Sequence, residues 1–152
     1  MYSFEPFPEN ARELRKHLEM NRVRNCTVME AAVSSAEGEA TFDPSEDRCM
    51  GRLAPSGSLR VRTVTLDGLV SRQEIRSPNL MKIDIEGAEF ECLQGASNVI
   101  LESRPIIFLA THGRGIHSAC IELLAKWNYR LTSLDEKPVE SADELIARPR
   151  KG

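Results

Sequence analysis

Two patterns of apolar and polar residues alternate along most of the chain. Residues 59–66 switch between apolar and polar with a period of two, which predicts a strand with one solvated face. Ala11, Leu14 and Leu18 instead recur at i, i+3 and i+7, which predicts a helix over residues 9–21. The same two patterns predict the other elements.

The remaining predicted elements continue this alternation. Further strands are predicted at 2–4, 27–33, 40–42, 80–85, 106–111, 129–134 and 145–148, and further helices at 88–93, at 96–102 and from Ser118 onward. Residues 106–111 are strongly apolar, so this strand is expected to be buried on both faces. Alternating strands and helices predict an α/β fold with a mostly parallel sheet and helices on both faces. Residues 1–152 are expected to form a single domain, with residues 43–58 as an inserted loop.

Composition mainly excludes classes of function. A net charge of -3 leaves no basic surface for nucleic acid. The apolar runs are too short to span a membrane, and the N-terminus does not resemble a signal peptide. The cysteines lie far apart, which is typical of neither a zinc site nor a disulfide framework: Cys26, Cys49, Cys92 and Cys120. These features predict a cytoplasmic protein that contacts neither nucleic acid nor membrane, and they leave its oligomeric state open.

The first candidate for chemistry is Glu5, which follows a predicted strand. In an open parallel sheet, ligands bind beyond the carboxyl ends of the strands. A carboxylate there can accept hydrogen bonds from the two vicinal hydroxyls of a ribose, and Pro6 or Phe7 could cover an adenine. Glu5 could instead be a solvated charge near the N-terminus of the next helix, and spacing alone favours this second explanation.

The second candidate is the pair Asp84 and Glu86. They lie two residues apart at a strand end, so both side chains are expected to point the same way. Gly87 then allows a sharp turn. The pair could hold a cation, act as acid and base, or bind the ammonium or sulfonium group of a cofactor. Alternatively, Glu86 and Glu89 only complement a helix N-terminus. The run does not match a calcium loop, and no motif assigns a metal to the chain.

The third candidate is His112, directly after the strand expected to be most buried. Its imidazole could take a proton from a hydroxyl, although a hydrogen-bonded histidine in a turn fits as well. His17 and His117 are expected at the surface or as capping residues. The sequence lacks the glycine-rich phosphate-binding motifs and the nucleophile elbow of serine hydrolases.

A longer run of residues resembles a known family. Residues 81–96 read Met-Lys-Ile-Asp-Ile-Glu-Gly-Ala-Glu-Phe-Glu-Cys-Leu-Gln-Gly-Ala. This run resembles the signature of the FkbM family of S-adenosylmethionine-dependent methyltransferases. Residues 2–8, 18–38, 65–67 and 104–112 are also similar, so the resemblance covers nearly the whole chain. It implies a Rossmann-like class I methyltransferase fold and O-methylation of a hydroxyl on a small molecule or glycan.

The resemblance also implies roles for individual residues. Cofactor-binding roles fall to Glu5, Pro6, Ala32 and Asp84. Catalytic roles fall to Asp84, Glu86 and His112. Glu5 would bind the ribose of S-adenosylmethionine and the Ala32 region would border the adenine. Asp84 and Glu86 would lie near the transferred methyl, and either His112 or Asp84 would act as the base.

One part of the family pattern is missing. Family members begin with a strand and a glycine-rich turn that this sequence does not show, so an N-terminally truncated fold is expected. The missing strand would lie between the strands ending at Glu5 and Asp84. Those strands would pair directly, recruit another chain or stay open, with both carboxylates at one edge of a common sheet. The alternatives are an inactive fragment that binds no cofactor and a Rossmann-type nucleotide-sugar or dinucleotide enzyme.

Overall fold

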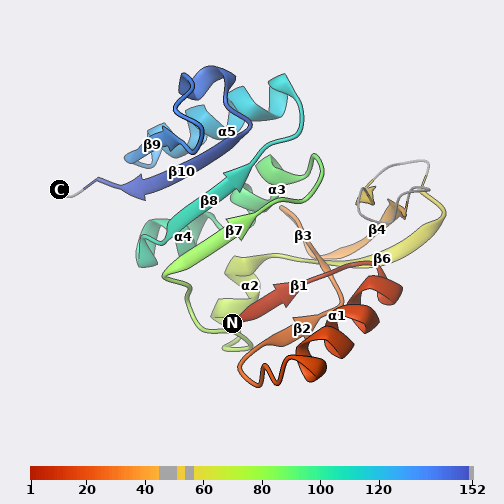
Figure 1. Cartoon of the computed structure of the whole chain (residues 1–152). Helices are drawn as coiled ribbons and strands as arrows, with labels where there is room; N and C mark the ends of the chain where they lie inside the picture. Colours follow the sequence, from red (N-terminus) through yellow and green to blue (C-terminus); the bar gives the residue numbers. More distant parts are fainter. Residues whose placement is uncertain (45–50, 54–56, 151–152) are drawn as a thin grey trace.

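The strands of the chain form three separate sheets in the described residues (Figure 1). The computed structural model describes residues 1–44, 51–53 and 57–150. A parallel pair consists of β1 (Tyr2–Phe4) and β2 (Thr27–Met29). A second sheet has the order β3 (Ala32–Val33), β6 (Leu59–Val64), β4 (Gly38–Asp43) and β5 (Arg52–Leu53). A third has the order β7 (Leu80–Ile83), β8 (Ile106–Ala110), β10 (Glu144–Pro149) and β9 (Tyr129–Ser133).

The α/β class is confirmed, but the expected mostly parallel sheet is wrong. The pairs β1–β2, β3–β6 and β7–β8 are parallel. In contrast, β4 runs antiparallel to β5 and β6, and β10 runs antiparallel to β8 and β9. Only a short 3-10 helix at Val139–Ser141 lies between β9 and β10. Because a parallel pairing needs a long crossover, such a connection returns the chain antiparallel.

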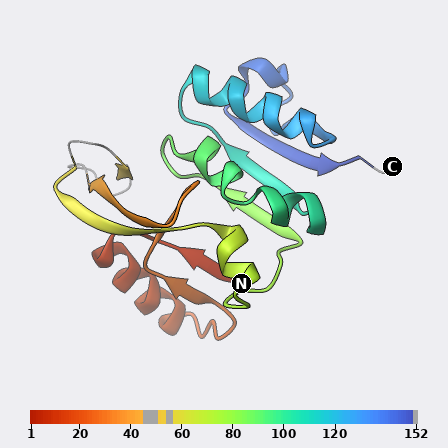
Figure 2. The ribbon, with the colours of Figure 1, turned by 180° about the vertical axis from the view of Figure 1, so that it is seen from behind.

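Three of the helices, α3 (Glu89–Gln94), α4 (Ser97–Ser103) and α5 (Arg114–Lys126), cover one face of the third sheet. The other α-helices of the described residues are α1 (Pro8–Met20) and α2 (Leu66–Ser71). Figure 2 shows α3, α4 and α5 in front of this sheet, whereas its strands lie in front in Figure 1. In β8, Ile107 and Leu109 are buried, but Ile106 and Phe108 on the other face are partly exposed. The expectation that this strand is buried on both faces is therefore wrong.

Several element boundaries also differ from the prediction. The strand expected at 27–33 is split between two sheets, since the chain turns at Glu30 and Ala31 with a hydrogen bond from the Ala31 amide to Met29 O. The helix expected from Ser118 begins at Arg114, and α2 was not predicted. Within the expected loop 43–58, residues 45–50 and 54–56 lie outside the described part of the chain.

One large core joins the helices to the ends of the strands. Its fully buried members include Leu69, Leu93, Ile100 and Leu124. Phe4 at the end of β1 and Ile85 just after β7 both pack against this core. The ends of β1 and β7 therefore rest on one hydrophobic cluster although they belong to different sheets.

Asp67 in α2 caps the start of α4, which has no capping side chain of its own. Its carboxylate accepts hydrogen bonds from the Asn98 and Val99 amides at 3.0 and 2.9 Å and from the Ser97 hydroxyl at 3.2 Å. Replacing Asp67 with alanine leaves these donors without their acceptor. We expect the free energy of unfolding to fall by about 2 kcal/mol, measured by urea denaturation.

The control for this prediction is Asp67→Asn, which keeps one acceptor oxygen and should lose clearly less stability. Equal stability of Asp67→Ala and the unaltered protein would show that the cap contributes nothing.

The described residues contain neither a disulfide nor a helix able to cross a membrane. Among the described residues, Cys26, Cys92 and Cys120 are free thiols. No helix in the described ranges combines the length and the apolar character needed to cross a bilayer.

Candidate active site

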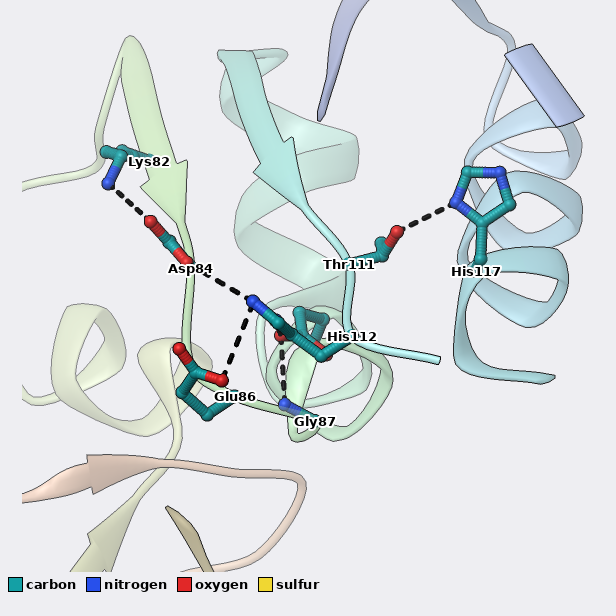
Figure 3. Close-up of polar contacts among 8 residues, drawn as sticks. Lys82, Asp84, Glu86, Gly87, Thr111, His112 and His117 are labelled. Atoms are coloured by element: carbon teal, nitrogen blue, oxygen red, sulfur yellow. Dashed lines mark hydrogen bonds and ion pairs between the residues drawn. The ribbon is translucent and has the colours of Figure 1, made fainter. Parts of the chain in front are cut away.

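The ends of β7 and β8 bring the central candidates together. The two strands are parallel neighbours with Ile83 opposite Leu109. Asp84 directly follows β7, and His112 lies two residues beyond β8 (Figure 3). Because parallel neighbours end at the same edge, the sequence placed these two residues at one site, and the structure brings them together.

Three side chains converge at this edge. The Nε2 atom of His112 lies 3.9 Å from Asp84 Oδ1 and 3.6 Å from Glu86 Oε2. Both distances are too long for hydrogen bonds. The other oxygen of Asp84 accepts from Lys82 Nζ at 2.8 Å. One oxygen of each carboxylate is thus left near the same imidazole nitrogen.

Glu89 is the functional residue that the sequence analysis treated only as a helix-end charge. Its side chain is fully buried, and Oε1 accepts from the Gly87 amide at 3.0 Å and lies 2.8 Å from His112 Nδ1. Its Oε2 has no hydrogen-bond partner among the described residues. The sequence feature that indicates burial of Glu89 is its spacing, because it shares a helix face with the buried Cys92 and Leu93 at i+3 and i+4.

The contact with Glu89 determines how the His112 ring is protonated. A carboxylate only accepts, so Nδ1 carries the hydrogen and the Nε2 edge faces Asp84 and Glu86. Partial burial of the ring opposes its protonation. The hydrogen bond to Glu89 and the nearby negative charges outweigh this effect, so the pKa of His112 lies above its ordinary value of 6.5.

A left-handed turn aims Glu86 at this cluster. Glu86 has φ 52° and Gly87 has φ 103°, and Figure 3 shows the Glu86 carboxylate pointing toward His112. An added Cβ at Gly87 would make only an ordinary contact, 3.8 Å from Ile116 Cδ1. The turn therefore requires glycine for its backbone conformation rather than for lack of space.

A cavity of about 680 Å³ opens beside the cluster. Its lining residues are Asp84, Ala110, Thr111, His112, Gly113, Asp135, Asp143 and Glu144. This lining contains four carboxylates and neither lysine nor arginine. The cavity therefore favours ligands or ligand groups that are cationic or rich in hydrogen-bond donors.

The Glu5 candidates form a second group. Glu5 Oε1 accepts from the Phe7 amide at 2.8 Å. Burial raises the pKa of Glu5 above 4.5, although hydrogen bonds from Phe7 and Asn10 oppose this. The Phe7 ring stacks on Phe42 with centroids 6.2 Å apart, and both belong to the small cluster that contains Ala32. Pro6 lies between Glu5 and Phe7 and is half-buried.

The expected common sheet for Glu5 and Asp84 is wrong. Among the described residues, β1 pairs only with β2, and β7 pairs on one side only, with β8. The two strands do not pair directly, so each keeps one edge without a strand neighbour there. In Figure 1 the arrows of β1, β7 and β8 nevertheless point toward the same side of the molecule.

The remaining histidines differ from each other. His17 is exposed on α1, as expected. His117 was expected at the surface or as a cap, but it is buried. Its Nε2 donates to Val139 O and its Nδ1 lies against the Thr111 hydroxyl, each at 2.8 Å. His117 therefore joins β8, α5 and the 3-10 helix instead of facing solvent.

Sequence comparison assigns the chain to a family. The profile of the Methyltransferase FkbM domain matches residues 1–131. The chain belongs to the FkbM methyltransferase family. Hexuronic acid methyltransferase AglP of Haloferax volcanii is 30% identical to this FkbM domain over 115 residues, which are 74% of the chain and 47% of AglP. The chain thus spans about half the length of this curated relative.

A solved structure agrees with this assignment at the level of the fold. The crystal structure of methyltransferase FkbM from Methylobacillus flagellatus KT matches with a TM-score of 0.68 and 18% identity. The match covers 96% of this chain and 36% of the other chain. The resemblance that residues 81–96 indicated is confirmed.

Proposed function

We propose that this FkbM domain transfers a methyl group from S-adenosylmethionine to a hydroxyl oxygen of a small molecule or glycan. The observation that carries the proposal is the cluster of Asp84, Glu86 and His112 beside the cavity, with buried Glu89 behind the imidazole. The similarity to a hexuronic acid methyltransferase supports a sugar as the acceptor.

The Glu5 group fits the nucleoside part of the cofactor. When bound, S-adenosylmethionine supplies an electrophilic methyl group on a sulfonium. The Phe7 amide holds the Glu5 carboxylate in place, and an ionised carboxylate has further lone pairs for the two ribose hydroxyls. Pro6 and the cluster around Ala32 provide an apolar border for the adenine.

The His112 group fits the acceptor side. Glu89 fixes the ring with Nε2 toward the cavity, where the unprotonated nitrogen can take the proton of an acceptor hydroxyl. Asp84 and Glu86 accept hydrogen bonds from neighbouring hydroxyls and orient the acceptor. Displacement requires the oxygen to lie in line behind the methyl group, so this orientation contributes directly to the rate.

Replacing Glu5 with glutamine tests the cofactor assignment. Glutamine keeps an acceptor for the Phe7 amide but removes the charge that strengthens hydrogen bonds to the ribose. We expect S-adenosylhomocysteine to bind roughly 10–100-fold more weakly, since a hydrogen bond to a charged group is worth about 1.5–3 kcal/mol. Isothermal titration calorimetry measures the change.

The matched control is Glu13→Gln, which alters an exposed carboxylate paired with Lys16 on the neighbouring helix. It should bind S-adenosylhomocysteine like the unaltered chain. Unchanged affinity in Glu5→Gln would refute the ribose assignment.

Titration of the unaltered chain tests the function itself. A saturable signal with S-adenosylhomocysteine supports a cofactor-binding enzyme. No binding by a chain that circular dichroism shows to be folded supports the alternative, a non-catalytic fragment. The edges of β1 and β7 that lack a strand neighbour in the described residues favour this alternative.

A further inference from the structure

We propose that Asp84, Glu86 and His112 bind a divalent metal ion, and that Glu89 positions His112 for this role. The ligand atoms would be Asp84 Oδ1, Glu86 Oε2 and His112 Nε2. Binding of the ion stands on the geometry alone. Its use in catalysis, to hold the acceptor, rests on the proposed function.

The spacing of the three atoms suits one ion. All three lie within 4.8 Å of one another, and the imidazole nitrogen is 3.6 and 3.9 Å from the two oxygens. Bonds of about 2.1 Å to a common ion put neighbouring ligand atoms about 3.0–3.4 Å apart in octahedral or tetrahedral geometry. Closing the site therefore needs the imidazole nitrogen to approach each oxygen by about 0.2–0.9 Å, within the freedom of partly exposed side chains.

The surroundings of His112 match those of a metal ligand. Ligating histidines characteristically donate their second N–H to a carboxylate, which fixes the ring and turns the other nitrogen toward the ion. His112 makes this contact with Glu89 at 2.8 Å. Its Nε2 then faces two carboxylate oxygens at distances longer than a hydrogen bond, and a cation between them satisfies all three atoms.

Glu89 provides an independent indication of missing positive charge. Its carboxylate is fully buried, and Oε2 has no hydrogen-bond partner in the part of the chain that the structure describes. A buried carboxylate is costly unless a positive group compensates it. Its Oε1 lies 2.8 Å from His112 Nδ1, so a metal ion on the far nitrogen of that ring would bring positive charge to Glu89 through the imidazole.

Apart from His112 itself, the cations of the described residues do not fill this role. The cavity lining includes Asp84, Asp135, Asp143 and Glu144, but neither lysine nor arginine. Lys82 binds the other oxygen of Asp84, and Lys137 is paired with Asp135. The negative potential of the cavity therefore attracts a cation from solution.

The donor set indicates the kind of ion and its use. Two carboxylates and one imidazole suit Mn²⁺, Mg²⁺ or Zn²⁺. Three ligands from the protein leave coordination positions for water or for two neighbouring hydroxyls of an acceptor. An ion there lowers the pKa of a bound hydroxyl and so favours loss of its proton before methyl transfer. In this arrangement Nε2 acts as ligand, and the proton of the bound hydroxyl passes to a water molecule of the solvent.

Titration with Mn²⁺ in the absence of cofactor tests the site. Electron paramagnetic resonance follows the loss of the free Mn²⁺ signal. We expect saturable binding of one ion per chain, weakened at least tenfold in both His112→Ala and Glu86→Gln. Glu89→Gln should weaken binding about 10–100-fold, because it removes the carboxylate behind the ligand. Mg²⁺ and Zn²⁺ are then tested as competitors.

Two substitutions of exposed residues serve as matched controls. Glu91→Gln changes an exposed residue of the same helix, α3, and His17→Ala changes an exposed histidine on α1. Both should keep the Mn²⁺ affinity of the unaltered chain. Circular dichroism verifies folding. If Glu89→Gln unfolds, Glu86→Gln still decides, because Glu86 is partly exposed and its replacement removes no buried contact.

The outcomes separate the metal site from the proposed function. Absence of saturable Mn²⁺ binding, or equal affinity in Glu86→Gln and Glu91→Gln, overturns the metal site. A chain that binds S-adenosylhomocysteine but not Mn²⁺ keeps the methyltransferase proposal and loses the metal. A chain that binds Mn²⁺ through Glu86 but never binds S-adenosylhomocysteine supports the metal site and counts against the proposed function.

Discussion

Replacing Gly95 with alanine is expected to destabilise the folded chain by about 3 kcal/mol. An added Cβ would lie 2.0 Å from Ser34 O and 2.9 Å from Ser34 C. These are backbone atoms, so no rotamer change relieves the clash, and the loop after β3 must move away from α3. For a domain of this size the melting temperature should fall by roughly 6–12 °C. Differential scanning calorimetry measures the change.

Gly115→Ala is the matched control for this substitution. Gly115 lies in the first turn of α5, and an added Cβ would meet nothing within 4 Å. Alanine favours a helix over glycine, so this variant should be as stable as the unaltered chain or more stable by up to about 1 kcal/mol. A similar loss in both variants would contradict the steric explanation.

Replacing His112 with alanine is expected to slow methyl transfer by about 10²–10⁴-fold, the usual contribution of a positioned acid–base group. The expectation follows from the proposed function, in which this ring takes the acceptor proton or holds the ion that acidifies it. The measurement is the rate of S-adenosylhomocysteine formation from S-adenosylmethionine with a panel of sugar acceptors. Affinity for S-adenosylhomocysteine should change little, because Glu5 and its neighbours hold the nucleoside.

His17→Ala controls for the loss of an imidazole elsewhere and should keep the full rate. Full activity of His112→Ala would remove the imidazole from the mechanism. Equal losses of rate and of cofactor affinity would instead indicate that the substitution disturbs the fold of the site.

Local structure followed closely from the sequence, because it depends on neighbouring residues. The alternation in residues 59–66 predicted β6, in which Val61 and Thr63 are buried while Arg60 and Arg62 are exposed. The helical spacing of Ala11, Leu14 and Leu18 predicted α1 to within one residue at each end. Which strands pair depends on contacts between distant segments, so the division into three sheets and the antiparallel pairing of β10 were not predicted. The short antiparallel strand expected at 40–42 is confirmed by β4.

The candidate site was only partly predictable, because it too depends on contacts between distant segments. Asp84 and His112 follow adjacent parallel strands, so a rule about strand ends was enough to bring them together. The same rule placed Glu5 at one edge of a common sheet with Asp84, but β1 and β7 neither pair directly nor share a strand neighbour in the described residues. Glu89 was missed because a carboxylate suggests a solvated position, although its spacing with Cys92 and Leu93 placed it on the buried face.

The position of β10 has a consequence for the order in which the protein assembles during synthesis. β10 lies between β8 and β9, although it is the last of these strands to be translated. Before it emerges from the ribosome, β9 has no strand partner, and Tyr129, which is buried in the finished fold, has no completed sheet beside it. Until then the nascent chain exposes the edges of β8 and β9 that later pair with β10, which is the interval in which a chaperone would protect it best.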